Sequence, residues 1–321
     1  MRRALITGIT GQDGSYLAEL LLEKGYEVHG LTRSLENAAS SRIAHLQRRL
    51  QIHAFDQKNK QELEKIVSAI TPTEIYHLAG QSDVHHSFEI PEETTESIAL
   101  FTLWLLEFLR QKALATKFFH AASSEIFGRP ATSPQNEETP MVPVNPYGCA
   151  KAFGRRMVAI YRDKYNLPAS NGILFNHESP RRGENFVSRK ICLAAAKIKK
   201  GEQKELLLGD MSAKRDWAHA KDFVRGMWMA LQNSKPDDYV FATGILHTVQ
   251  DVVEIAFNTM ELDWKKYVHQ DPSLVRPSEK TTLVGDASKA RQVLSWTPQV
   301  SFEEMIREMT LAELATSPRP T

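Results

Sequence analysis

The sequence predicts an α/β protein with a doubly wound parallel sheet and a smaller C-terminal α/β domain. The first observation behind this fold class is an alternation of short apolar segments, typical of buried strands, with amphipathic helical segments. Strands that alternate with helices form a parallel sheet covered on both faces. The second observation is the length of 321 residues, which exceeds what one small core needs. The third is a loss of the regular alternation after about residue 176.

The N-terminal half supplies the clearest elements. A buried strand is expected at residues 4–7, followed by a glycine-rich turn and an amphipathic helix through residues 16–22. Gly25 ends that helix, and residues 27–31 form the second strand. Further strands are expected at residues 52–55, 74–78, 117–121 and 169–174, and a helix at residues 95–110, where Leu103, Leu106 and Leu109 keep a helical phase.

The change of pattern near residue 176 suggests the domain division. Residues 1–175 are expected to form the sheet domain, with later segments at about 210–245 interleaved. Residues 176–321 are expected to form mainly a substrate-binding domain, rich in arginine-containing loops and scattered prolines. The last residues, 316–321, are expected to be a frayed tail.

Composition excludes several classes of protein. The hydrophobic share of 42% and the charged share of 25% are those of an ordinary soluble globular protein. Lys+Arg 40 against Asp+Glu 39 leaves a formal net charge of +1, so no overall field attracts nucleic acid or an anionic membrane. Cys149 and Cys192 are too few for a disulfide framework or a four-cysteine zinc site.

Targeting segments are not expected either. The N-terminal apolar run breaks at Gly8, which is too early for a signal peptide, and no stretch approaches the ~20 apolar residues of a membrane span. We therefore expect a cytoplasmic protein.

The glycine-rich turn predicts a nucleotide cofactor. Gly8, Gly11 and Gly14 lie in the run Gly-Ile-Thr-Gly-Gln-Asp-Gly between the first strand and the first helix. Glycines there permit a tight turn and let backbone N–H groups approach a pyrophosphate at the helix N-terminus. Such turns can be merely structural, but this position after a strand and before a helix favours a Rossmann-type sheet.

The end of the second strand indicates which dinucleotide binds. NAD-preferring sites usually place an acidic residue there to hold the ribose hydroxyls, whereas this chain has Arg33 and Ser34. A cation and a hydroxyl suit the 2′-phosphate of NADP. Arg33 could instead be a solvated loop residue, and the nearby Glu36 keeps NAD open.

Tyr147 and Lys151 form a candidate catalytic pair. They lie at positions i and i+4, on one face of a helix that Pro146 begins. A phenol with a pKa of about 10 is a poor base at neutral pH. We expect the Lys151 ammonium to favour the phenolate and so to lower the pKa of Tyr147.

A second candidate group is the run Ser123-Ser124-Glu125, just after a predicted parallel strand. Catalytic groups collect at the carboxyl edge of such sheets. The two hydroxyls could bond a substrate oxygen, and the carboxylate could act as an acid–base group. The alternative is an ordinary helix cap with a favourable acid in the first turn.

The order of these three motifs resembles the extended short-chain dehydrogenase/reductase family. Longer runs are similar to its GDP-mannose 4,6-dehydratase members, and the likeness extends from about residue 4 to about residue 308. The runs are residues 8–14, 172–180, 214–217 and 220–222, Asp271-Pro272 and Arg276-Pro277.

The resemblance implies a set of site residues. The catalytic residues would be Ser123, Glu125, Tyr147 and Lys151. The NADP site would comprise Gly8, Ile9, Thr10, Gly11, Gln12, Asp13, Gly14, Arg33, Asp56, Gln57, Leu78, Ala79, Gly80, Gln81, Ser82, Tyr147, Lys151, His177 and Arg182. The GDP-sugar would contact Ser124, Asn176, Arg189, Arg215, Arg276 and Glu279. Several arginines suit a diphosphate even in a nearly neutral protein.

The reaction implied is conversion of GDP-mannose to GDP-4-keto-6-deoxymannose and water. Tyr147 would take the proton of the 4-hydroxyl while hydride passes to NADP+, and Glu125 would remove the C5 proton and help expel the C6 hydroxyl. Hydride would then return to C6. Ser123 would polarise the 4-oxygen, and Lys151 would hold the cofactor ribose.

Other functions remain open at this point. A GDP-manno-heptose could replace GDP-mannose as the substrate. An epimerase or 4-keto-reductase would share Tyr147 and Lys151 but generally lacks the carboxylate of Glu125, and a non-catalytic NADP-binding protein would be expected to have lost Tyr147 or Lys151.

The chain departs from the family pattern at two positions. Ser123 stands where threonine is usual and keeps a hydroxyl, and Glu93 replaces a tyrosine that faces the cofactor. Asp83, His85 and His86 are too few ligands for a metal site, so none is expected. In the family the loop after Arg33 reaches a neighbouring subunit, which implies a homo-oligomer, either a dimer or a tetramer.

Overall fold

The computed structural model describes residues 1–39, 41–112, 114–275 and 282–315. Its largest element is a seven-stranded sheet in the order β10-β6-β5-β4-β1-β2-β3, and all neighbouring strands of that sheet are parallel. The sheet contains β1 (Arg3–Thr7), β2 (Glu27–Thr32), β3 (Leu50–Ala54), β4 (Glu74–His77), β5 (Lys117–Ser123), β6 (Ala169–Leu174) and β10 (Asp238–Phe241). The predicted fold class is confirmed.

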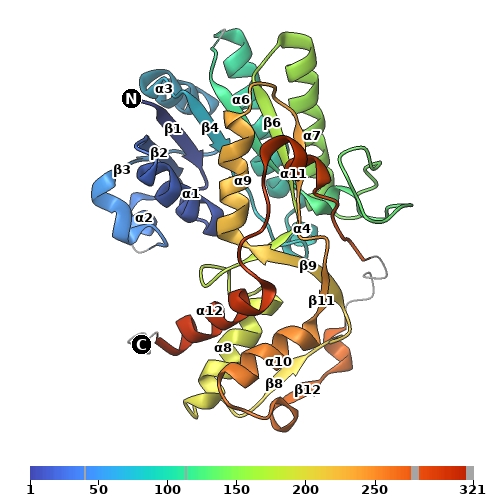
Figure 1. The fold of residues 1–321 in the computed structure, drawn as a ribbon. Helices are drawn as coiled ribbons and strands as arrows, with labels where there is room; N and C mark the ends of the chain where they lie inside the picture. Colours follow the sequence, from blue (N-terminus) through green and yellow to red (C-terminus); the bar gives the residue numbers. More distant parts are fainter. Residues whose placement is uncertain (40, 113, 276–281, 316–321) are drawn as a thin grey trace.

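Helices cover both faces of this sheet (Figure 1). On one face lie α1 (Gln12–Glu23) and α9 (Ala220–Gln232), whose buried residues share one core with β1, β6 and β10. On the other face α3 (Lys60–Ile70), α6 (Phe101–Gln111) and α7 (Pro146–Tyr165) share a second core with β4 and β5. Strands buried on both faces explain why the sequence shows continuous apolar runs.

Short elements connect the layers. They are α2 (Leu35–Ala39), η1 (Ala44–Arg49), α4 (His86–Glu89), α5 (Pro91–Thr95), the π-helical η2 (Glu96–Leu100), the 3-10 turn η3 (Ser124–Ile126) and α11 (Ser288–Leu294). The single helix predicted at residues 95–110 is therefore α6 preceded by a π turn. Apolar periodicity cannot distinguish these two forms, because both keep an apolar face on the sheet.

A second lobe carries its own core (Figure 1, lower part). Its helices α8 (Val187–Lys199), α10 (Val249–Thr259) and α12 (Phe302–Ala315) pack with β8 (Leu206–Leu208) and β12 (Val268–Gln270), which pair in parallel. The 3-10 turns η4 (Trp264–Lys266) and η5 (Pro272–Leu274) flank β12. A three-stranded sheet, β11-β9-β7, contains β7 (Asn176–Glu178), β9 (Lys214–His219) and β11 (Leu246–Thr248). The predicted tail at residues 316–321 lies outside the described residues.

The strand order places the site. β1 lies between β2 and β4, so the chain leaves the sheet in opposite directions on the two sides of β1. A crevice opens at such a switch point, outside the carboxyl ends of the strands. The turn after β1 and the ends of β4 and β5 face this crevice.

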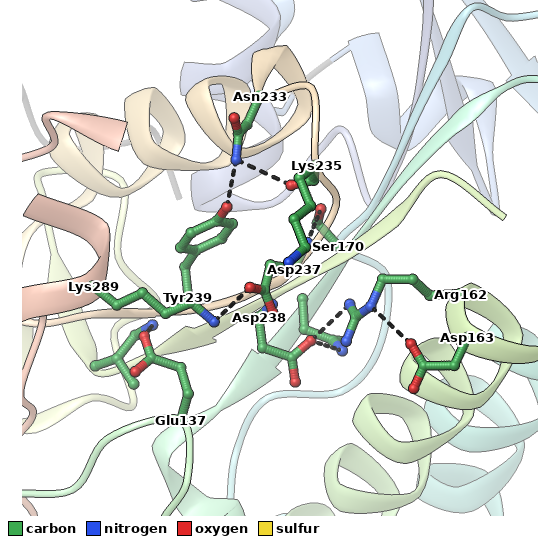
Figure 2. Close-up of polar contacts among 12 residues, drawn as sticks. Glu137, Arg162, Asp163, Ser170, Asn233, Lys235, Asp237, Asp238, Tyr239 and Lys289 are labelled. Carbon is green, nitrogen blue, oxygen red and sulfur yellow. Dashed lines mark hydrogen bonds and ion pairs between the residues drawn. The ribbon is translucent and has the colours of Figure 1, made fainter. Parts of the chain in front are cut away.

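The edge strand β10 is held by a polar network (Figure 2). The carboxylate of Asp238 accepts hydrogen bonds from Arg155 at 2.9 Å and Arg162 at 2.9 Å. The carboxylate of Glu137 accepts the backbone N–H of Val240 at 2.7 Å. Arg155 also donates to the carbonyl of Glu137 at 2.5 Å. Glu137, in the segment that leads from η3 to α7, is thereby joined to the sheet edge.

Candidate functional site

A cavity of about 1050 Å³ lies between the large sheet and the second lobe. The sheet contributes the turn after β1, the ends of β2, β4 and β5, and the start of α7. The second lobe contributes residues of β7 and β9, including Arg215 and Trp217. The cavity therefore joins the predicted cofactor site to the predicted sugar site.

The turn after β1 fits a pyrophosphate. Gly8 has a φ of +74°, and a Cβ there would lie 3.0 Å from the backbone of Ala79, so only glycine is suitable. In the described structure no side chain caps α1 at Gly11. The first N–H groups of the helix therefore face the cavity in the way that anion sites at helix N-termini require.

Most of the predicted cofactor residues line this cavity. They are Gly8, Thr10, Gly11, Gln12, Asp13, Gly14, Arg33, Gln57, Leu78, Ala79, Gly80, Gln81, Ser82, Tyr147, Lys151, His177 and Arg182. Two others do not line it. Ile9 is fully buried against Gly30, and the Asp56 carboxylate accepts the N–H of Lys58 at 2.9 Å. Glu36, the residue for which NAD remained an alternative cofactor, also lies outside the lining of the cavity.

Asn145 connects the two segments that carry the predicted catalytic residues, and the sequence analysis did not identify it. Its Oδ1 accepts the N–H of Gly148 at 2.7 Å, which caps α7 and sets the position of Tyr147 in the first turn. Its Nδ2 donates to the Glu125 carboxylate at 2.8 Å. The available signal was asparagine before Pro146, a typical N-cap followed by proline at N1.

Tyr147 lies buried at the centre of this arrangement. Burial raises its pKa to about 12, a hydrogen bond with Ser123 acts in the opposite direction, and the charge of Glu125 raises it further. The sequence led us to expect a pKa lowered by Lys151. In the structure the loss of hydration dominates, so the phenol is protonated at neutral pH.

Lys151 is buried one helical turn away. Its Nζ donates to the carbonyl of Ala121 at 2.6 Å and lies 5.7 Å from the centroid of the Tyr147 ring. Burial lowers the pKa of Lys151 to about 8. The buried His77 nearby is neutral, because burial and the charge of Lys151 lower its pKa to about 3. Sequence reasoning did not identify His77.

The predicted sugar-site residues are divided. Ser124, Asn176 and Arg215 line the cavity, and so does Glu93 of α5, the position that was expected to face the cofactor. Arg189 does not line it, because its Nε donates to Glu313 at 2.6 Å. Arg276 and Glu279 lie outside the described residues.

The histidine-containing loop forms local contacts. His86 Nδ1 lies 2.7 Å from a Glu89 oxygen, and Asp83 accepts the N–H of His85 at 2.8 Å. Within the part of the chain that the structure describes, no group of three or more His, Cys, Asp or Glu residues could hold a metal ion.

Among the described helices, none combines the length and the apolar character that crossing a membrane requires.

Comparison with known proteins identifies the family. The profile of the GDP-mannose 4,6 dehydratase family matches residues 5–309. GDP-mannose 4,6 dehydratase 2 of Arabidopsis thaliana is 47% identical, over 98% of this chain and 88% of its own length. GDP-mannose 4,6 dehydratase of Drosophila melanogaster is 46% identical, over 97% and 86%.

Solved structures show the same fold at lower identity. The dTDP-glucose 4,6-dehydratase DesIV of Streptomyces venezuelae, solved with NAD and TYD bound, has a TM-score of 0.85 at 23% identity, covering 97% of this chain and 96% of its own. The family profile and the curated relatives each extend over nearly the whole chain, and the chain therefore belongs to the GDP-mannose 4,6-dehydratase family.

Proposed function

We propose that this protein converts GDP-mannose to GDP-4-keto-6-deoxymannose and water, with Ser123, Glu125, Tyr147 and Lys151 as catalytic residues. The observation that carries the proposal is the shared position of Glu125 and Tyr147. Both line one cavity, and Asn145 joins them through the 2.8 Å contact with Glu125 and the cap of α7. A redox step needs only the tyrosine, whereas elimination of water also needs the carboxylate.

NADP is the proposed cofactor. The uncapped start of α1 suits its pyrophosphate, and Arg33 lines the cavity where a 2′-phosphate would be held. When bound, NADP+ would accept a hydride from C4 of the sugar, return it to C6 and bring a positive ring that lowers the pKa of the nearby phenol. Ile9, which is fully buried, would support this site from behind its surface, and Asp56 is proposed from the family resemblance alone.

The first step depends on the buried phenol. With its pKa lowered by the positive ring of the bound cofactor, Tyr147 would act as the phenolate and take the proton of the sugar 4-hydroxyl as C4 is oxidised to the ketone. Ser123 hydrogen-bonds the same oxygen. Lys151 holds the cofactor ribose and keeps positive charge beside the phenolate. The pKa of Lys151, about 8, leaves the amine largely charged at neutral pH.

Glu125 performs the second step. The new C4 ketone acidifies the C5 hydrogen, and the Glu125 carboxylate removes it as a proton. The same group, now protonated, donates to the C6 hydroxyl, which leaves as water while a C5–C6 double bond forms. Hydride addition at C6 and protonation at C5 complete the product, and the proton that Tyr147 took from the 4-hydroxyl balances the one added at C5, so there is no net oxidation. Asn145 keeps the carboxylate aimed at the cavity throughout.

The GDP-sugar would lie toward the second lobe. Ser124, Asn176 and Arg215 line the cavity and are proposed to contact it, and Arg189, Arg276 and Glu279 are proposed from the family resemblance alone. In this arrangement residues 1–175, with the segment at about 210–245, hold the cofactor. Residues 176–321 mainly hold the GDP-sugar.

The decisive experiment is turnover by the purified protein. GDP-mannose and NADP+ should give an alkali-sensitive 4-keto product with one water lost, as measured by mass spectrometry. Turnover of a GDP-manno-heptose without turnover of GDP-mannose would overturn the substrate assignment. A 4-epimer or a reduced sugar with no water lost would overturn the dehydratase assignment.

A homo-oligomer, either a dimer or a tetramer, is also proposed. Phe153 and Ile160 are seven residues apart on α7 and 40% and 43% exposed, and Leu100, the last residue of η2, is 37% exposed. Large apolar side chains on one helical face are typical of an interface between copies. Light scattering of the wild type and of Ile160→Glu tests this, and a monomeric wild type contradicts it. We further propose a cytoplasmic protein that binds neither nucleic acid nor membranes.

A further inference from the structure

A polar contact joins the start of α1 to β7. The side chain of Asp13, in the first turn of α1, lies 2.8 Å from Nε2 of His177. Gln12 reinforces the contact, since its Nε2 donates to the His177 carbonyl at 3.1 Å and to the Asp13 carboxylate at 3.1 Å. The Ser179 hydroxyl donates to the Gln12 amide oxygen at 2.8 Å. Residues far apart in the sequence thus bind the dinucleotide turn to the small sheet.

The surroundings of His177 indicate a doubly protonated ring. Nδ1 lies 2.7 Å from the carbonyl of Phe175, which can only accept, so Nδ1 carries a hydrogen. Nε2 faces the Asp13 carboxylate, which also accepts when ionised. Both nitrogens are satisfied only in the imidazolium form. The ring stacks on Phe223 at a centroid distance of 4.4 Å, which fixes its plane.

The contact also bears on the catalytic pair. The charge of Asp13 acts on both Tyr147 and Lys151, and in each case it raises the pKa. A carboxylate in the first turn of α1 would repel an anionic ligand at the same helix end. A cationic partner at 2.8 Å cancels most of that repulsion, and Arg182 adds positive charge nearby.

We propose that Asp13 and His177 form an ion pair that acts as a latch, holding the dinucleotide turn against the strand that carries Asn176. The latch fixes the distance between the cofactor and the GDP-sugar, so both residues are positioning residues for the reaction. This inference rests on the proposed function, since it assigns the latch to an NADP site and a sugar site. The latch itself is a property of the folded chain.

The latch is intact only within a range of pH. Burial alone would raise the pKa of Asp13, but the charge of His177 outweighs burial and the pKa is lowered. The negative charge of Asp13 is therefore lost only as pH falls through that lowered value. Burial alone would lower the pKa of His177, but the charge of Asp13 outweighs burial and the pKa is raised. The positive charge of His177 is therefore lost as pH rises through that raised value. The other charged or titratable groups facing the pair are Arg182, Glu178, Tyr147 and Lys151.

The first test uses hydrogen exchange in the full-length protein without added ligand. Asp13→Asn and His177→Gln should each speed amide exchange in two segments, residues 8–23 and residues 172–180. The double variant should exchange no faster than either single one. Faster exchange in only one of the segments would overturn the latch, and so would additive effects. This readout needs no turnover, so it decides the latch even if the proposed reaction fails.

The second test measures the dissociation constant of NADP+ by fluorescence titration. Each single variant should weaken binding about tenfold, and the double variant also about tenfold rather than a hundredfold, because the two residues act as one unit. The wild-type affinity should fall above the raised pKa of His177, measured by NMR of its ring, and the His177→Gln profile should lose this step and keep only the one due to Lys151. Glu303→Gln, at an exposed ion pair of 2.7 Å with Arg307, is the matched control and should change nothing.

The outcomes separate the two proposals. A wild-type protein that binds NADP+ with the coupling described but does not dehydrate GDP-mannose would contradict the function and leave the latch standing. The opposite outcome is a protein that dehydrates GDP-mannose but whose two single variants weaken NADP+ binding independently, so that their effects multiply in the double variant. That result would contradict the latch and leave the function standing.

Discussion

The two walls of the cavity are built differently. On the sheet wall, Ser123, Tyr147 and Lys151 are buried, and each is fixed by a strand end or the first turns of a helix. On the wall of the second lobe, Arg215 is partly exposed on the three-stranded sheet, and Arg189 is paired away from the cavity. In the proposed assignment, the chemistry thus depends on regular backbone, whereas recognition of the sugar nucleotide depends on long side chains from short elements.

This difference has a physical cause. Proton transfer requires heavy atoms within about 3 Å of each other, and a parallel strand followed by a capped helix supplies that accuracy. A diphosphate is large and symmetric, so arginines can reach it from several directions. We therefore expect substitutions on the sheet wall to act on kcat and substitutions on the other wall to act on KM.

The largest effect is expected for Tyr147→Phe. Removing the hydroxyl leaves no group to accept the proton of the 4-hydroxyl, and the first oxidation should slow by about 10³-fold or more. Single-turnover measurement of NADPH absorbance should show no transient reduction. The melting temperature should change little, because the ring is retained. A normal reduction transient would show that another group is the base.

Glu125→Gln should have the next largest effect and a different pattern. The side-chain amide oxygen of the glutamine can still accept the hydrogen bond from Asn145, but the amide cannot remove the C5 proton. Water loss should therefore slow by about 10²- to 10³-fold. Oxidation at C4 should persist, and NADPH should accumulate in a single turnover. Glu138→Gln, at an exposed carboxylate in the segment between η3 and α7, is the matched control and should behave as wild type. Unchanged water loss in Glu125→Gln would contradict the assigned role.

The sequence was most informative about the sheet wall. Spacing alone placed Tyr147 and Lys151 on one helical face, and the glycine turn followed the first strand as expected. Such motifs are local, because i and i+4 positions on a helix and the turn after a strand are set by neighbouring residues. The predicted strands accordingly agree with the observed ones to within about two residues.

Contacts between distant segments could not be predicted from the sequence. The pairing of Arg189 with Glu313 joins residues 124 positions apart, and that of Asp13 with His177 joins residues 164 apart. Neither spacing follows from a periodic pattern. The raised pKa of Tyr147 was missed for a related reason, since burial depends on how α7 packs against η2 and η3 and not on the motif itself.

The sugar wall can be tested with two arginines. Arg215→Gln should raise the KM for GDP-mannose about tenfold with little change in kcat or melting temperature, because one charged contact is lost. Arg189→Gln should instead lower stability by about 2 kcal/mol, since Glu313, whose side chain is 6% exposed, loses a cationic partner. Steady-state kinetics and thermal denaturation separate the two results. A large KM effect with unchanged stability in Arg189→Gln would mean that Arg189 leaves Glu313 to bind the nucleotide.

The last prediction concerns how the stability of the sheet wall depends on pH. Burial lowers the pKa of Lys151 to about 8, whereas an unfolded lysine titrates near 10.5, so the unfolded chain binds more protons between these values. Stability should therefore rise with pH across this range, by at most about 3 kcal/mol. Lys151→Met removes the buried charge and keeps most of the volume, although it loses the hydrogen bond to Ala121.

This variant should be inactive yet more stable than the wild type at pH 7, by up to about 2 kcal/mol, or a few degrees in melting temperature. The gain should disappear by about pH 10, where the wild-type amine is neutral in the folded protein. Lys164→Met, at an exposed lysine in the last turn of α7, is the control and should show no such pH dependence. A Lys151→Met protein that is less stable at every pH would mean that the contact with Ala121 outweighs the cost of burying the charge. In that case the lysine would stabilise the sheet wall as well as serve the reaction.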